Sequence, residues 1–169
     1  MDAIALLKKH HKKTKASLKK LAREPDAELL SEIADEMAGH MIIEETIFYP
    51  AASRVKPDLV LESYEEHAIA QFELKRLLAT DLEDDRFEAR VKALLELFTS
   101  HADEEEQDLF PRIEKAFDED ELDIMGAQMK ETFDEIVDRG HEAVLPRPPA
   151  TVTADRLSKR IASEALHVG

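Results

Sequence analysis

The chain has 169 residues, of which 43% are hydrophobic and 36% are charged, and its formal net charge is -15. This length suits one domain, and so acidic a surface argues against binding to nucleic acid or to an anionic membrane. The absence of cysteine excludes disulfides, thiolate catalysis, zinc ribbons and iron–sulfur clusters. The N-terminus lacks the apolar run of a signal peptide, and no stretch approaches the length of a membrane span, so we expect a cytoplasmic protein.

Two helices are predicted within residues 2–48. Residues 2–23 carry a helical stripe of apolar residues that also includes His11, and a Glu-Pro-Asp sequence then breaks the helix. Asp26 has the character of an N-cap for a second helix over residues 27–48. The inner row of that second helix mixes apolar and polar side chains, namely Leu30, Ile33, Met37, His40, Glu44 and Ile47.

Two further helices are predicted over residues 57–80 and 86–109, and Pro111 begins a short continuation to Phe117. The side chains expected to face inward from the third helix are Leu61, Tyr64, His67, Ala68, Gln71, Leu74 and Leu78. Those expected to face inward from the fourth are Val91, Leu94, Phe98, His101, Glu105 and Phe110. Short connections require neighbouring helices to be antiparallel, so the sequence predicts an all-α fold, an up-down-up-down four-helix bundle.

The pattern changes after the bundle. A fifth helix is predicted over residues 121–139, with Gly140 as its stop. A stiff Pro-rich linker at 146–149 follows, and residues 153–166 carry a weak signal for a last short helix. We therefore divide the chain into a four-helix bundle and a C-terminal helix, linker and tail packed on or beside it, with the boundaries 1–117 and 118–169.

Two segments are near copies of each other and carry metal-ligand chemistry. One begins at His40 and the other at His101, and each contains a Glu four residues after the His. Residues four apart lie on one face of a helix, so each imidazole and its carboxylate point at the same place. His11 and His67 precede these segments by comparable intervals. An ionised carboxylate in a core is costly unless it is paired or metal-bound, which favours metal binding by a set of six residues: His11, His40, Glu44, His67, His101 and Glu105.

Several neighbouring residues compete with these six. His10 lies off the stripe that contains His11, and we expect its removal to be nearly silent. Tyr64 is expected to be a core aromatic with a hydrogen-bonded hydroxyl. Two roles are equally compatible with Gln71: it donates a hydrogen bond beside the site, or it simply packs in the bundle. Three glutamates fall off the inner rows and are expected at the surface or just outside the site, namely Glu45, Glu104 and Glu106. Two histidines outside the bundle are expected at the surface, namely His141 and His167.

The ligand types restrict the metal. Imidazole and carboxylate donors without thiolate suit iron, manganese or zinc. Six side chains cannot complete two octahedra unless the carboxylates bridge and solvent supplies the remaining donors. Such solvent-held positions are where dioxygen or peroxide could bind to a pair of irons.

These residues resemble the hemerythrin-like proteins, the group named for its His-His-Glu cation-binding domain. The resemblance covers about residues 4–115 and rests on four motifs: Leu6-Leu-Lys-Lys-His-His11, His40-x-x-x-Glu44-Glu-x-x-Phe-Tyr-Pro50, Glu66-His67 and His101-x-x-x-Glu105-Glu-x-x-Leu-Phe-Pro111. It implies a four-helix bundle around a non-haem di-iron centre. The four histidines would then be terminal ligands, and Glu44 and Glu105 would bridge the irons.

The chain departs from the oxygen-carrying hemerythrins at Gln71, where those proteins have a second His one turn after the third-helix ligand. One iron would therefore lose an imidazole, which disfavours reversible dioxygen transport. The resemblance implies a protein that binds or senses dioxygen, peroxide or nitric oxide, or that handles iron. Two alternatives are an enzyme that decomposes peroxide and a regulatory module in which the metal state changes the packing of the helix at 121–139. The sequence identifies no protein partner.

Overall fold

The computed structural model describes residues 1–145, and within them it contains helices and no strand. Four long helices make up the bundle, namely α1 (Ala3–Arg23), α2 (Ala27–Ile43), α4 (Pro57–Leu78) and α5 (Phe87–Glu104). Within residues 1–145, none of the helices combines the length and apolar character needed to cross a bilayer. Three of our predictions lie outside the described residues: the Pro-rich linker at 146–149, the helix at 153–166 and the surface position of His167.

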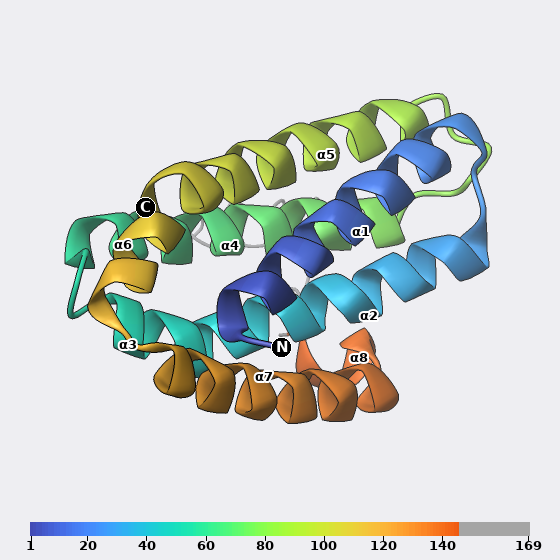
Figure 1. Ribbon diagram of the computed structural model, residues 1–169. Coiled ribbons are helices and arrows are strands. Elements are labelled where there is room, and N and C mark those ends of the chain that lie inside the picture. Colours follow the sequence, from blue (N-terminus) through green and yellow to red (C-terminus); the bar gives the residue numbers. More distant parts are fainter. Residues whose placement is uncertain (146–169) are drawn as a thin grey trace, which may run out of the picture.

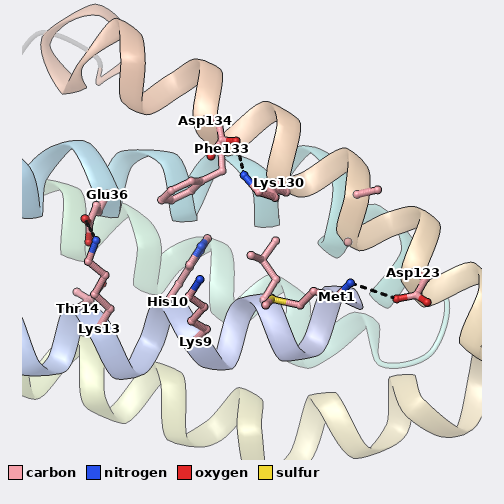
Figure 2. A pocket seen from close by; sticks show the side chains of 13 residues that line it. Met1, Lys9, His10, Lys13, Thr14, Glu36, Asp123, Lys130, Phe133 and Asp134 are labelled. Atoms are coloured by element: carbon pink, nitrogen blue, oxygen red, sulfur yellow. Dashed lines mark hydrogen bonds and ion pairs between the residues drawn. The ribbon is translucent and has the colours of Figure 1, made fainter.

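The four long helices pack as an up-down-up-down bundle, as predicted (Figure 1). Helix α1 contacts α2 and α5, and α4 contacts the same two helices, so the four close into a ring around a shared core. A further long helix, α7 (Glu119–Arg139), lies outside this ring across α1 and α2. A cavity of about 550 Å³ separates part of α7 from α1 (Figure 2). The short helix α8 (His141–Val144) packs back onto α2.

The helix ends follow local capping chemistry. The Asp26 side chain accepts a hydrogen bond from the backbone N–H of Leu29, as expected of an N-cap. Asp118 and Glu121 form a capping box, so α7 begins two residues before the predicted start at 121. At the other end of α7, Gly140 has a φ of 76°, a conformation that favours glycine and ends the helix as predicted.

Two π-helical turns interrupt the bundle, and each begins at one of the candidate bridging glutamates. They are η1 (Glu44–Phe48), followed by α3 (Tyr49–Ala52), and η2 (Glu105–Leu109), followed by α6 (Phe110–Ala116). The second helix was expected to end at Phe48, but the chain stays helical to Ala52 despite Pro50. In a π-turn the N–H of residue i+5 bonds to the carbonyl of residue i, and Pro50 has no N–H to give to Glu45. The Glu45 carbonyl instead accepts a hydrogen bond from the Tyr64 hydroxyl at 3.1 Å.

The inward face of α4 differs from the predicted one. Leu61 is 67% exposed and Ala68 is also exposed, although both were expected to face the core. The buried row is Val60, Ser63, His67, Ala70, Leu74 and Leu77. This row follows the alternating three- and four-residue spacing of a bundle seam, and it shares only His67 and Leu74 with the predicted one. The apolar character of Leu61 misled the prediction because α4 carries apolar residues on its outer face as well.

The core consists of two apolar clusters with a polar layer between them. Leu7 and Ile43 belong to the first cluster, while Leu18 and Met37 belong to the second. His11 lies between Leu7 and Leu18 on α1, and the other candidate ligands interrupt the remaining bundle helices in the same way. The fold therefore places a buried polar layer near the middle of the bundle, where each polar atom needs a partner.

Candidate metal centre

All six residues selected from the sequence meet in this polar layer, and all six side chains are buried. They come from the four bundle helices and from the first residues of the two π-turns, namely His11, His40, Glu44, His67, His101 and Glu105. Burial on this scale removes water as a partner for the carboxylates, so the groups must satisfy one another or bind a cation.

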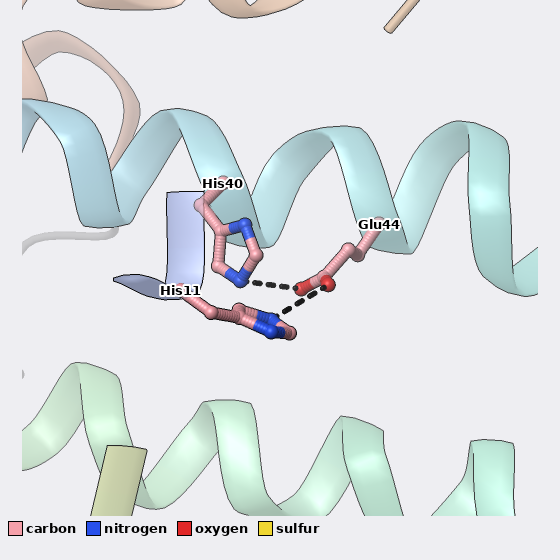
Figure 3. A group of neighbouring side chains, drawn as sticks. All are labelled: His11, His40 and Glu44. Atoms are coloured by element: carbon pink, nitrogen blue, oxygen red, sulfur yellow. Dashed lines mark ion pairs between the residues drawn. The ribbon is translucent and has the colours of Figure 1, made fainter. Parts of the chain in front are cut away.

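Two imidazoles face one carboxylate on the α1–α2 side of the layer (Figure 3). The Nε2 atom of His40 lies 3.3 Å from Oε2 of Glu44, and the Nε2 atom of His11 lies 3.9 Å from Oε1 of the same residue. Donor atoms of the three residues lie within 4.8 Å of one another. This spacing allows one ion to contact all three side chains.

A second group of donors shares Glu44. Its Oε2 atom lies 3.2 Å from Nε2 of His67, which in turn lies 3.2 Å from Nε2 of His101. Glu105 lies between the two groups as well, because its Oε2 atom is 3.3 Å from Nε2 of His11 and 3.7 Å from Nε2 of His101. Both carboxylates are therefore positioned to contact two ions at once.

Outer carboxylates hold three of the four imidazoles. Each contacts the Nδ1 atom of a histidine and so leaves Nε2 facing the centre, an arrangement common among metal-binding histidines. The pairs are His11 with Glu106 at 2.8 Å, His67 with Glu45 at 2.9 Å, and His101 with Glu66 at 2.7 Å. Glu45 and Glu106 thus lie just outside the site, one of the two positions expected for them, while Glu104 is exposed. The role of Glu66 was not predicted from the sequence.

Tyr49 also belongs to the centre, and the sequence analysis did not select it. Its hydroxyl donates a hydrogen bond to Oε1 of Glu105 at 2.9 Å and lies 3.1 Å from Nε2 of His67. The π-turn makes this possible, because Tyr49 follows Glu44 by five residues and its N–H bonds to the Glu44 carbonyl. The corresponding residue in the second repeat is Phe110, which stacks on His11 and offers no oxygen. The two halves of the centre are therefore chemically different.

Burial and mutual charge set the protonation of the metal-free centre. Burial, followed by the negative charge of Glu105, raises the pKa of Glu44 well above its usual value. Burial also acts on Glu105, but the positive charges of His101 and His11 outweigh it and lower the pKa of Glu105. Burial and then the Glu105 charge raise the pKa of Tyr49. One carboxylate thus tends to keep a proton while the other is ionised.

The donor atoms that face the centre fit a cation. Seven buried nitrogen and oxygen atoms lack a hydrogen-bond partner within the described part of the chain. Five of them point into the layer: Nε2 of His11 and His40, both carboxylate oxygens of Glu44, and Oε2 of Glu105. Unpaired buried acceptors and imidazoles are costly in an apolar core, and divalent ions would satisfy them together.

Two competing residues lie beside the donor groups rather than within them. His10 is half-buried and stacks on Phe133 of α7 with ring centroids 4.2 Å apart, and burial, followed by the charge of His11, lowers its pKa to about 4. Gln71 is half-buried and belongs to neither donor group. Tyr64 has the hydrogen-bonded hydroxyl that was predicted.

His141 was expected at the surface, but it is half-buried. Its backbone N–H bonds to a carboxylate oxygen of Asp35 at 2.7 Å, and its Nδ1 atom lies 2.6 Å from the same oxygen. The prediction was wrong because α8 packs back onto α2, which brings His141 beside Asp35. His141 thus anchors α8 and lies apart from the metal centre.

Comparison with known proteins decides the family. The profile described as "Hemerythrin HHE cation binding domain" matches residues 2–113, which include every candidate ligand. This chain belongs to the hemerythrin HHE cation-binding family. The match ends before α7, so the fifth helix lies beyond the part of the chain that defines the family.

Relatives of this HHE protein occur in mycobacteria. The protein Rv2633c of Mycobacterium tuberculosis is 31% identical over 117 residues, which cover 66% of this chain and 71% of the relative. The protein Mb2666c of Mycobacterium bovis matches to the same extent. A crystal structure of an HHE cation-binding domain-containing protein from Mycobacterium kansasii, a homologue of Rv2633c, has a TM-score of 0.72 and 26% identity. The matched region covers 82% of this chain and 89% of the Mycobacterium kansasii chain.

The hydroxyl of Tyr49 is expected to stabilise the HHE centre before any metal binds. Tyr49→Phe should cost the metal-free protein roughly 1.5–3 kcal/mol, because it removes a buried hydrogen bond to an ionised carboxylate. Tyr64→Phe is the matched control and should cost about 0.5–1.5 kcal/mol, since its hydroxyl bonds a neutral carbonyl. Denaturant unfolding in the presence of a chelator measures both changes. A larger loss for Tyr64→Phe would contradict the assignment of Tyr49 to the centre.

Proposed function

We propose that this protein holds two iron ions in the buried layer and that the centre reacts with dioxygen or hydrogen peroxide. The shared position of Glu44 carries the proposal, because donor atoms of this one carboxylate belong to both groups of potential ligands. Mixed imidazole and carboxylate donors without thiolate suit iron, and the same donors also accept manganese or zinc. Membership of the HHE family supports a cation as the ligand of the site.

The proposed ligands divide between the two ions. His11 and His40 would serve the ion on the α1–α2 side, and His67 and His101 would serve the other. Glu44 and Glu105 would bridge both ions, since each carboxylate lies near imidazoles of both pairs. The hydroxyl of Tyr49 is a further oxygen donor on the His67–His101 side. The Tyr49 hydroxyl therefore lies close to His67, a proposed ligand of the second ion. That ion is the one expected to lose an imidazole, because Gln71 stands where the oxygen-carrying hemerythrins have a His.

A small, mostly apolar cavity lies beside the centre between α2, α4 and α5. Its volume is about 170 Å³, and its walls include the edges of His40, His67 and His101. Most of the remaining lining is apolar, including Met37, Met41, Ile69, Leu97 and Phe98. A charged molecule would lose its hydration on entering such a space, whereas dioxygen, nitric oxide and hydrogen peroxide are small and neutral. The cavity therefore favours ligands of this class.

The chain supplies positioning and proton handling at the centre. When bound, two iron ions would provide the electron transfer that reactions of dioxygen or peroxide require. The outer carboxylates fix the orientation of three imidazoles, and the buried layer excludes bulk water. The Tyr49 hydroxyl holds its proton, because burial and the Glu105 charge raise its pKa, and it donates a hydrogen bond to Glu105. A hydrogen-bond donor beside the centre supports the second candidate function, catalytic decomposition of peroxide, because such a donor can stabilise charge that develops on a peroxide oxygen.

Metal content and reactivity test the proposal. Protein purified without chelators should contain two metal ions per chain by elemental analysis. The reduced iron-loaded protein should be oxidised by air or by hydrogen peroxide, as followed by its absorption spectrum, without forming an adduct that releases dioxygen under vacuum. Release of dioxygen gas from added peroxide would identify the catalytic function. A folded protein without metal affinity would contradict the whole proposal, and reversible uptake of dioxygen that vacuum removes would restore a carrier function.

A further inference from the structure

The fourth histidine of the centre lacks the outer partner that the other three have. The Nδ1 atom of His40 is buried and has no hydrogen-bond partner within residues 1–145. If Nε2 of His40 faces the metal, its proton must lie on Nδ1. A buried N–H without an acceptor is costly, and metal-binding histidines almost always donate this N–H to a neighbouring group. The centre therefore needs an acceptor beside His40.

His10 is the residue placed to meet this need. Its own Nδ1 atom is buried and lacks a partner in the described part of the chain. The rings of His10 and His40 contact each other edge to face, with centroids 5.9 Å apart and planes at 74°. A neutral imidazole carries one acceptor nitrogen, so His10 can accept from His40 when its own proton lies on Nε2. The two Nδ1 atoms are not bonded to each other in the metal-free centre, and each lacks any other partner in the described residues, so a small approach of the two neighbouring rings would satisfy both.

Helix α7 fixes the position of His10. The His10 ring rises from α1 toward Phe133 on α7, and the two rings are tilted by 32° with centroids 4.2 Å apart (Figure 2). On its other side Phe133 packs against α2 at Gly39, where an added Cβ atom would lie only 2.9 Å from the Phe133 ring. The absence of a side chain at Gly39 thus lets Phe133 fit between α1 and α2. The fifth helix, which lies beyond the family match, reaches the metal centre through this contact.

We propose that His10 is a positioning residue of the metal-loaded centre: when Nε2 of His40 binds metal, the two rings approach and the Nδ1 atom of His10 accepts the hydrogen bond that Nδ1–H of His40 donates, while Phe133 of α7 packs against His10. The inference rests on the proposed function, because it requires His40 to bind metal through Nε2. It replaces the expectation that loss of His10 is silent. The ion held by His11 and His40 then has one outer carboxylate, Glu106, behind its imidazoles, whereas the other ion has two. The two ions are thereby inequivalent.

Two variants of equal size test whether His10 acts as the hydrogen-bond acceptor for His40. His10→Asn keeps an acceptor oxygen about where Nδ1 of His10 lies, and His10→Leu has the same shape without an acceptor. Cobalt(II) is the probe, with affinity measured by competition against a chelator. We expect His10→Leu to weaken binding of one of the two ions roughly 10-fold or more, as loss of other outer partners does. His10→Asn should restore most of that affinity.

Proton NMR of the cobalt-loaded protein supplies a readout independent of activity. Each metal-bound histidine should give one exchangeable, paramagnetically shifted N–H signal. His10→Leu should shift one of these signals or lose it through faster exchange with water, while His10→Asn should retain it. Equal affinities and equal spectra for the two variants would overturn this inference while leaving the proposed function intact. A wild-type chain that binds no cobalt, iron or manganese would overturn both.

Discussion

Replacing Glu44 with Gln is expected to have opposite effects on the metal-free and metal-loaded protein. In the metal-free state the buried Glu44 carboxyl has a raised pKa, caused first by burial and then by the charge of Glu105. A group whose pKa rises on folding contributes stability that is complete below its unfolded value and is lost as the pH rises through the folded value. The contribution of Glu44 to the stability of the metal-free protein should therefore decline as the pH rises above the unfolded value of 4.5.

The variant removes this pH dependence, because Gln does not titrate. Metal-free Glu44→Gln should be more stable than the wild type at neutral and alkaline pH, by roughly 1–4 kcal/mol, and the difference should shrink as the solution is acidified. In the presence of metal the order should invert. The amide cannot supply the anionic oxygens shared by the two donor groups, so metal content should fall from two ions to one or fewer.

Metal affinity of the wild type should also rise with pH. An ion must displace the proton that Glu44 keeps in the metal-free state, so binding releases protons and is favoured as the pH increases. Urea unfolding at several pH values, with metal and with chelator, measures both effects. Glu32→Gln is the matched control, because Glu32 is exposed on the same helix. If Glu44→Gln and Glu32→Gln changed the free energy of unfolding in the same way at every pH, with metal and with chelator, the inward position of Glu44 between the two donor groups would be contradicted.

Loss of any one candidate histidine ligand is expected to remove most of the stabilisation that metal provides. A ligand present at about 1,000 times its dissociation constant stabilises the folded state by about 4 kcal/mol per site. The metal-dependent increment in stability is the difference between the unfolding free energies measured with metal and with chelator. Alanine at His11, His40, His67 or His101 removes one donor from a buried group, so metal binding should weaken and this increment should fall.

His141→Ala is an informative control for this series. It breaks the contact with Asp35 and should lower the stability of the protein with and without metal by similar amounts. The metal-dependent increment should then remain at the wild-type value, because His141 lies on α8, apart from the donor groups. A loss of increment in His141→Ala as large as in His40→Ala would show that the effect reports general stability rather than metal ligation.

The sequence alone determined those features that depend on residues close together in the chain. A His and a Glu four residues apart share one helix face, so the pairs at His40 and His101 could be placed in the core before any tertiary structure was known. Helix starts and stops at Asp26 and Gly140 were also readable, because capping depends on side chains within one turn. The bundle followed from these helices and their short connections.

Other features were decided only by the tertiary structure. The outer carboxylate of His11 is Glu106, 95 residues away, and no local pattern pairs them. Tyr49 enters the centre because a π-turn shifts the helical register by one residue, which a search at a spacing of 3.6 residues does not detect. The ring contact between His10 and Phe133 of α7 joins residues far apart in the chain, so no local pattern predicts it. Helical periodicity fixes which residues share a face, but the packing of the helices decides what that face meets.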